Sequence, residues 1–172
     1  ADAWINMPHQ ASNSYVQSFA NFVLDHLRPT LKVYVEYTNE HWNTDPDYPQ
    51  SDYMLEQAEI KGLGDDYSSQ AEQRSLFYAQ RSVEIFQIWR EVFAETPERV
   101  LRVLGGFIAM PSLTELMLEF RDTLNNIDFL ALGVYFGAYL TEESVADAVS
   151  EMSLSQLFAE MNQGGLTEDE SQ

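Results

Sequence analysis

Two glutamates lie four residues apart in a short apolar stretch, and their spacing suggests acid–base chemistry. Glu36 and Glu40 belong to the string KVYVEYTNEHWN, residues 32–43. A carboxylate inside a buried strand is unfavourable unless another group pairs with it, and strand alternation places positions 34, 36, 38 and 40 on one side. The spacing predicts a polar sheet face that leads to Glu40 at the carboxyl end of the strand. We expect Arg102, on a neighbouring strand, to pair with Glu36.

Aromatic residues follow Glu40 closely. Trp42 comes two positions later, and more tyrosines follow at Tyr48, Tyr53 and Tyr67. A flat aromatic ring suits the apolar hydrogens on the face of a pyranose. A carboxyl group beside such rings predicts a site that binds sugars, although Asn39-Glu40 alone is also compatible with an ordinary transition from strand to loop.

The elements that position these residues alternate between strand and helix. Strands are predicted at residues 2–7, 31–38, 100–109 and 127–136, and helices at 12–28, 69–95, 112–124, near 141 and at 154–161. Residues 41–67 lack a clear period and are expected to form a long loop with a helical turn around Tyr53–Ile60. Such alternation is typical of an α/β fold with a parallel sheet. Two architectures fit: a doubly wound sheet, or a partial (β/α)8 TIM-barrel of about four βα units with flanking helices.

Charge and composition limit the classes of partner. The 172 residues include 28 acidic and nine basic side chains, for a formal net charge of −19. Such a surface repels nucleic acid and anionic lipid, so we expect no nucleic-acid partner and no membrane association. There is no cysteine, which excludes disulfides and thiolate metal sites. His9 and His41 lack the spacing and the third ligand of a metal site, so no metal is predicted.

The string Glu36-Tyr37-Thr38-Asn39-Glu40 resembles the fourth-strand signature of clan A glycoside hydrolases, E-x-x-N-E at the end of a strand. These are retaining (β/α)8-barrel enzymes that include cellulases and mannanases. The wider string WINMPH…LKVYVEYTNEHWN is similar to bacterial barrel proteins of this kind. The resemblance covers roughly residues 2–140 and implies strands three to six of the barrel.

The resemblance implies a role for each candidate residue. Glu40 would be the general acid/base, Asn39 would contact the sugar 2-hydroxyl, and Glu36 would be a structural carboxylate in the barrel lumen. Further substrate-binding positions at the same mouth are Asn6, His9, His41, Trp42 and Tyr135. The substrate would be a β-linked poly- or oligosaccharide, no cofactor is implied, and a secreted or periplasmic location is expected by family analogy.

The resemblance leaves the catalytic pair incomplete. A retaining site needs a second carboxylate roughly 5–5.5 Å from the first, and in this clan that nucleophile ends the seventh strand. We expect it to be missing from this chain, so the sequence is expected to be a fragment whose open sheet is covered by the missing part of the barrel or by a second copy. The alternatives are a non-catalytic carbohydrate-binding or inactive barrel relative, and an α/β interaction domain in which Glu40 is incidental.

Three further expectations concern packing and domain limits. Residues 1–162 are expected to form the barrel-like domain, and residues 163–172 an acidic disordered tail. The two glycines after Leu104 are expected to allow close packing or close backbone approach. Trp4 is expected to lie in the core.

Overall fold

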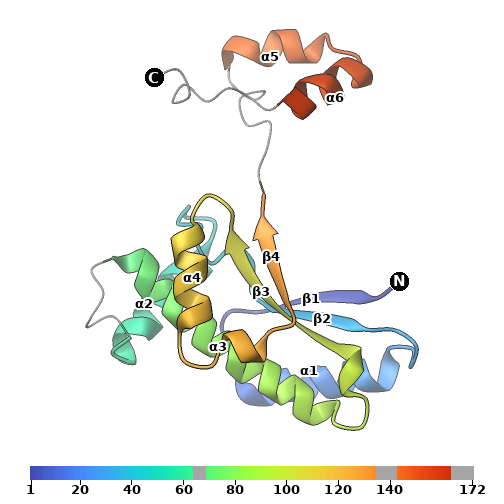
Figure 1. Cartoon of the computed structure of the whole chain (residues 1–172), viewed down its shortest axis with the longest axis vertical. Coiled ribbons are helices and arrows are strands. Elements are labelled where there is room, and N and C mark those ends of the chain that lie inside the picture. The colour runs from blue at the N-terminus through green and yellow to red at the C-terminus, as the bar shows by residue number, and fades with distance from the viewer. Residues whose placement is uncertain (64–68, 135–142, 164–172) are drawn as a thin grey trace. The chain divides into compact units, whose positions relative to one another are not determined.

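The structure is a computed structural model that describes residues 1–63, 69–134 and 143–163. The chain divides into two compact units, residues 1–133 and 134–172. Figure 1 shows the elements of the first unit, four strands and the helices around them. The strands are β1 (Ala3–Met7), β2 (Val33–Tyr37), β3 (Val100–Phe107) and β4 (Phe129–Gly133). The helices are α1 (Asn13–His26), α2 (Pro49–Ile60), α3 (Gln70–Val92) and α4 (Pro111–Glu119), with short 3₁₀ turns at Pro97–Arg99 and Leu124–Asn126.

The four strands form one parallel sheet in the order β1-β2-β3-β4. The predicted α/β class with a parallel sheet and flanking helices is therefore confirmed. Consecutive strands are neighbours throughout this sheet. Because all four strands are parallel, their carboxyl ends lie at the same end of the sheet. In parallel α/β folds, ligands bind at the carboxyl ends of the strands.

Local sequence explains where the helices begin. The Ser12 hydroxyl accepts a hydrogen bond from the Tyr15 N–H at the start of α1. Ser69 and Glu72 form a reciprocal capping box at the start of α3, which satisfies backbone donors that lack partners within the helix. Proline occupies the first position of α4, where its missing N–H costs nothing.

Helix α2 corrects the expectation of a long loop at residues 41–67, because it begins at Pro49 and includes the helical turn expected around Tyr53–Ile60. Its apolar residues do not follow a strong helical period, so the sequence alone gives little signal. Met54 and Ala58 are nevertheless fully buried in the core, where α2 packs against α3. Tertiary packing therefore stabilises this helix more than its own amphipathic pattern does.

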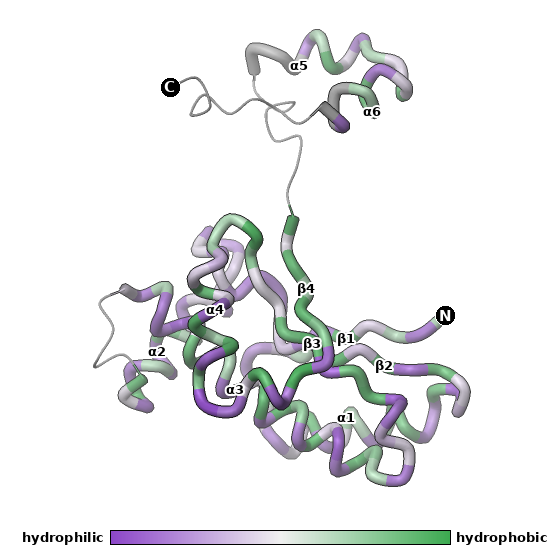
Figure 2. Tube along the Cα trace, in the orientation of Figure 1, coloured by the Kyte–Doolittle hydropathy of each residue, from purple (hydrophilic) through white to green (hydrophobic). Residues whose placement is uncertain are grey.

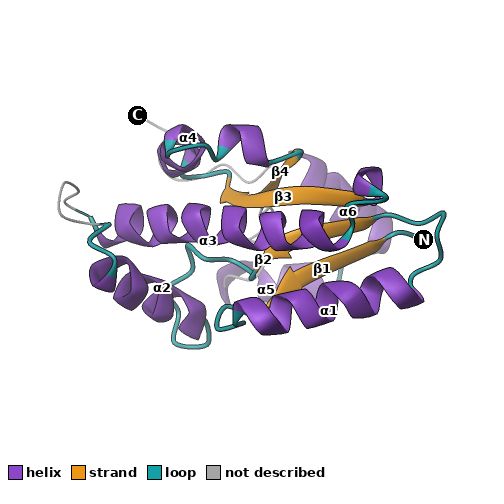
Figure 3. Ribbon diagram, turned by 90° about the horizontal axis from the view of Figure 1, so that it is seen from below, coloured by secondary structure: helices purple, strands orange, loops and turns teal. Residues whose placement is uncertain are grey.

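The core lies between the sheet and its helices. Figure 3 shows α1 and α3 along the same side of the sheet. The buried side chains on that side include Val35 of β2, Leu104 of β3, and Phe86 and Trp89 of α3. Met117 of α4 joins the same cluster. Leu76 and Ala79 of α3 are fully buried in it as well.

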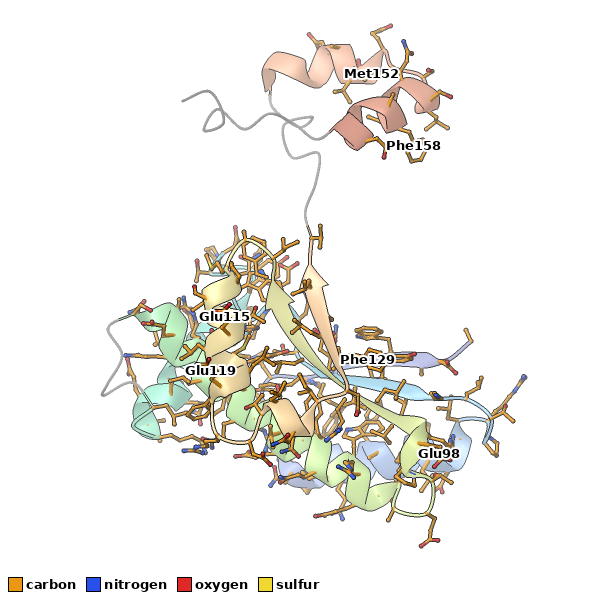
Figure 4. The ribbon with its side chains drawn as sticks, in the orientation of Figure 1. Glu98, Glu115, Glu119, Phe129, Met152 and Phe158 are labelled. Atoms are coloured by element: carbon orange, nitrogen blue, oxygen red, sulfur yellow. The ribbon has the colours of Figure 1, made fainter. Side chains whose placement is uncertain are left out.

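The opposite face of the sheet is largely open within the first unit. Trp4 is 54% exposed and Phe129 is 48% exposed, and Figure 4 shows the Phe129 side chain projecting from β4. Trp4 stacks on Tyr34 with ring centroids 5.2 Å apart, and Tyr34 lies beside Phe129 at 5.9 Å. The expectation that Trp4 is a core residue is wrong for the described part of the chain, because its strand position faces away from the helices.

The second unit contains two described helices, α5 (Glu143–Ser150) and α6 (Leu154–Gln163). Ser153 and Gln156 cap the start of α6, since the side-chain oxygen Oε1 of Gln156 accepts from the Ser153 N–H and hydroxyl. Leu154 and Phe158 of α6 are exposed. No helix in the described ranges is long and apolar enough to cross a membrane.

Candidate functional site

The chain makes a strained turn immediately after β2. Thr38 and Glu40 have φ values of 51° and 45°, in the left-handed region that costs a non-glycine residue on the order of 1 kcal/mol or more. Regular alternation therefore ends at Tyr37, and the expectation that positions 34, 36, 38 and 40 share one side is wrong for positions 38 and 40. Strain of this kind persists only where surrounding contacts hold the backbone.

Glu40 lies half-buried in this turn, and its carboxylate has a defined partner. The Asn43 side-chain amide donates to Glu40 Oε2 at 2.9 Å, and the Asn43 backbone N–H donates to the Glu40 carbonyl at 3.0 Å. The negative charge of Glu40 also raises the pKa of Tyr48 above its usual value. The carboxyl group is therefore held within a polar and aromatic surrounding beside the strand ends.

The first turn of α2 anchors the backbone that carries Glu40. The Gln50 side-chain amide donates to the Asn39 carbonyl at 2.7 Å. The Ser51 hydroxyl donates to the His41 carbonyl at 3.0 Å and also contacts the Asn43 carbonyl. Gln50 and Ser51 are both buried, so these bonds are shielded from water and fix the position of the turn.

His41 and Trp42 point into different surroundings. His41 is only 2% exposed, and its ring stacks on Tyr78 of α3 with centroids 3.9 Å apart. Burial lowers the pKa of His41 to about 3, so the ring is neutral near neutral pH. The predicted substrate-binding residue His41 thus lies beneath the turn.

Trp42 lies across the carboxyl ends of β3 and β4. Its ring stacks on Phe107 with centroids 5.6 Å apart and an interplanar angle of 9°. A Cβ atom placed on Gly133 would lie 2.8 Å from Trp42 Cζ2, so glycine is what permits this contact. Phe107 thereby covers one ring face of the half-buried Trp42. The ring follows β2 and contacts the last residues of β3 and β4.

The end of β1 contributes the other predicted residues. Asn6 is exposed and is the register partner of Glu36. His9 is half-buried beside Tyr53, and its carbonyl accepts a hydrogen bond from the Tyr37 hydroxyl at 2.7 Å. Burial lowers the pKa of His9. Tyr135 lies outside the described residues.

Glu36 lies on the open face of the sheet, as its position in the sequence predicts. Trp4 Nε1 donates to Glu36 Oε2 at 2.9 Å. Burial raises the pKa of the Glu36 carboxyl, and the bond from Trp4 partly opposes that shift. Glu36 Oε1 lies 2.7 Å from where a Cβ atom on Gly105 would be, which confirms that this glycine allows a close approach.

The expected pairing of Arg102 with Glu36 is wrong. Arg102 is the register partner of Val35, so it lies on the helix-covered face while Glu36 lies on the other. Its guanidinium instead binds Asp128, with Nη2 at 2.8 Å from Oδ1 and Nε at 2.9 Å from Oδ2. This bidentate pair holds the pKa of Asp128 below its usual value.

Two residues of this arrangement were missed by sequence reasoning. Asn43 follows Glu40 by three positions, a spacing that can close a turn, and this signal could have been used. Tyr78 is 37 positions from His41 along the chain, and no local pattern links the two. Tertiary packing alone brings Tyr78 to the strand tip.

The described residues form no cluster of metal ligands, and two of the pockets lie away from the strand ends. Within residues 1–63, 69–134 and 143–163, no group of three metal-ligating side chains converges. A pocket of about 360 Å³ lies between the start of α1, α2 and α3, where Gln10, Lys61 and Arg81 line it. Another of about 260 Å³ lies between α3 and the segment after α4, where Gln80 and Arg121 line it. Neither of these two pockets includes Glu40 or Trp42.

No family model matches the sequence, and no curated protein or solved structure is significantly similar to it. The chemistry of the site therefore rests on its own residues. A carboxyl, a carboxamide, a phenol and an indole lie together at the strand ends. Such a set can exchange hydrogen bonds with hydroxyl groups, stack on an apolar ring face and donate a proton.

Proposed function

We propose that this chain is part of a (β/α)8 barrel of the glycoside hydrolase type, and that its strand-tip site binds a β-linked poly- or oligosaccharide. Glu40 acts as general acid/base of a retaining mechanism, and Asn39 contacts the sugar. The observation that carries the proposal is the Glu40–Asn43 hydrogen bond at the tip of β2, beside an indole that lies over the neighbouring strand ends.

Strand order supports a barrel over a doubly wound sheet. A doubly wound sheet reverses its order at a switch point and carries helices on both faces, whereas a barrel adds each strand beside the previous one. The sheet follows the order β1-β2-β3-β4, and α1, α3 and α4 join one core on one face. The other face, which carries Trp4, Glu36 and Phe129, becomes the lumen when further strands close the barrel.

The sheet edge at β4 also supports closure by further strands. Parallel strands are usually covered on both faces, and Figure 2 shows β4 as hydrophobic along its length. Phe129 on one face and Leu132 on the other are both largely exposed in the first unit. The partners of this proposal are therefore carbohydrate and the rest of a barrel, supplied by the same polypeptide or by a second copy.

A second carboxylate is required for the retaining reaction, at roughly 5–5.5 Å from the acid/base. Glu36 is a poor candidate, because it lies on the strand beneath the tip and accepts a bond from Trp4. We assign the nucleophile to a strand other than β1–β4. By analogy with proteins of this type, the site of action is extracellular or periplasmic.

A non-catalytic carbohydrate-binding barrel is the alternative, and it uses the same surface. It is favoured by the placement of Trp42 and Asn43, which bind and orient a ligand whether or not a nucleophile is present. Saccharide binding is common to both functions, and only bond cleavage that depends on Glu40 separates them.

The test begins with calorimetric titration of the chain by cellopentaose, mannopentaose and xylopentaose, with the α-linked maltopentaose as a contrast. Binding of at least one β-linked pentasaccharide is expected, with loss of affinity in Trp42→Ala. Phe22→Ala is the matched control, since Phe22 is an exposed aromatic on α1 and lies outside the site. Equal affinity of the wild-type chain, Trp42→Ala and Phe22→Ala contradicts the proposal, and so does no binding of any β-linked probe.

The catalytic role of Glu40 is tested in a protein that includes the remaining strands of the proposed barrel. Glu40→Gln is expected to slow cleavage of the bound pentasaccharide by about 10²–10⁴-fold, the usual contribution of a general acid. It should have a much smaller effect on the glycosylation step with a 2,4-dinitrophenyl β-glycoside, because that leaving group needs no proton. Equal losses on both substrates would remove the acid/base assignment.

A further inference from the structure

Tyr78 belongs to α3, yet its side chain joins β3 to the turn after β2. It is 1% exposed. Its hydroxyl oxygen accepts a hydrogen bond from the Gly105 N–H at 2.8 Å. Its ring stacks on His41 with an interplanar angle of 11° and also on Tyr37, with centroids 5.7 Å apart. Tyr78 therefore connects α3 to the segment that carries Glu40.

Gly105 provides the space for this connection. A Cβ atom at position 105 would lie 2.9 Å from the Tyr78 hydroxyl and 2.7 Å from Glu36 Oε1. Real Cβ contacts are not this short, so any larger residue would displace one of these groups. Burial, followed by the negative charge of Glu36, raises the pKa of Tyr78, so the phenol keeps its proton across the physiological range.

The contact matters because the turn is strained. The hydrogen bonds from Gln50 and Ser51 hold backbone carbonyls of the turn. The His41 ring is held instead by stacking, at a centroid distance of 3.9 Å from Tyr78. His41 is covalently joined to Glu40, so the direction of its side chain constrains the backbone at the acidic residue.

We propose that Tyr78 is a positioning residue that holds the His41 ring and so keeps the Glu40 carboxylate oriented toward the Asn43 amide. This role rests on the function proposed above, because the orientation of Glu40 matters to a ligand that it contacts. A displacement of about 1 Å at an acid/base can lower a rate by about 10²-fold.

The test uses ¹⁵N-labelled samples of the whole chain and the NMR signal of the Asn43 side-chain amide, which reports its bond to Glu40. Glu40→Ala supplies the signal of the broken bond. Tyr78→Leu removes the stacked ring and is expected to move the Asn43 signal toward that reference. Tyr78→Phe keeps the ring, so it should leave the Asn43 signal in place while the Gly105 amide exchanges up to about tenfold faster.

Phe86→Leu is the matched control. Phe86 also lies on α3 and is fully buried, so its truncation destabilises the core without touching the turn. An unchanged Asn43 signal in Tyr78→Leu overturns the proposal, and so does an equal change in Phe86→Leu. If Tyr78→Leu does not fold, Tyr78→Met decides the question, since its flexible side chain can fill much of the same volume but has no ring to stack on His41. An Asn43 signal that stays at its wild-type position in that variant overturns the proposal as well.

Cellopentaose titration of the same samples separates this inference from the proposed function. If the wild-type chain does not bind cellopentaose, the result counts against a cellulose-type substrate for the proposed function. The Asn43 signal still decides the role of Tyr78 in that case. If the wild-type chain binds, Tyr78→Leu is expected to lose at least about tenfold in affinity, and Tyr78→Phe should restore it. Equal affinity of Tyr78→Leu and wild type contradicts the positioning role.

Discussion

Glu36 and Glu40 are four residues apart, yet their carboxylates have different surroundings. Glu36 accepts a hydrogen bond from Trp4 on the open face of the sheet, and burial raises its pKa. Glu40 lies in the strained turn beyond the strand and accepts from Asn43. Two carboxyl groups with such different environments can serve different roles, one in the sheet and one toward a ligand.

Glu36→Gln tests the energetic consequence of burying this acid. Its pKa is raised in the folded state, so its contribution to stability is present below its ordinary pKa of 4.5 and is lost as pH rises through the folded-state value. Gln keeps an oxygen that can accept from Trp4 but has no charge. We expect the variant to be more stable than wild type at pH 7 and equal to it at low pH, as measured by urea unfolding.

Glu98→Gln is the control for that comparison. Glu98 is exposed, and Figure 4 labels it, so neutralising it should change the free energy of unfolding little at either pH. A Glu36→Gln variant that is less stable than wild type at pH 7 would contradict the account, since it would mean that the charge itself stabilises the sheet.

At the scale of elements, regular periodicity predicted most of the fold. Residues 12–28 and 69–95 were predicted as helices and correspond to α1 and α3. The four predicted strands are all present, although β4 ends at Gly133 within the described residues. Only a helical turn around Tyr53–Ile60 was predicted where α2 lies, because the core contacts of Met54 and Ala58 stabilise the full helix rather than a strong local pattern.

The site was predictable only where it depends on strand ends. Asn6 and Glu36 are register partners on neighbouring parallel strands, and Glu40 lies in the turn that follows β2. The partner of Arg102 depends on register, which a single sequence does not specify, and Asp128 rather than Glu36 is its partner. The contact of Tyr78 with His41 depends on how α3 packs, so no spacing in the sequence predicts it.

Gly133→Ala tests the contact that places Trp42 on the strand ends. The added Cβ would meet Trp42 Cζ2 at 2.8 Å, so we expect the ring to leave Phe107 and the fold to lose about 1–3 kcal/mol, as in other overpacked sites. In a Trp42→Ala background the same change should cost much less. Urea unfolding of the wild type, Gly133→Ala, Trp42→Ala and the double variant gives the coupling free energy between positions 133 and 42. A coupling free energy near zero would contradict the contact.

At the scale of the whole molecule, two surface properties oppose one another. A net charge of −19 keeps chains apart, while the open sheet face exposes Trp4 and Phe129. Exposed apolar faces and sheet edges favour association. Added salt screens the repulsion, so the ionic strength decides which property dominates.

The account predicts that sodium chloride raises the melting temperature. Raising the ionic strength from about 0.01 M to about 1 M shortens the screening length roughly tenfold, which relieves repulsion among the acidic side chains. A gain of 1 kcal/mol corresponds to about 2–4 °C for a chain of this size. The double variant Glu115→Gln, Glu119→Gln, which neutralises two exposed glutamates on α4, should depend less on salt. A melting temperature that falls as salt is added would contradict this explanation.

The central claim is that the turn after β2 is a saccharide-binding surface, and residue-level NMR mapping with β-linked pentasaccharides tests it most directly. With cellopentaose or mannopentaose up to about 1 mM, where even weak binding of about −4 kcal/mol is visible, the account predicts signal changes at the Trp42 indole, the Asn43 side chain and the Glu40 backbone amide. Signals that stay unchanged with both probes, or that change only around Gln10 and Lys61 in the pocket beside α1, would contradict it.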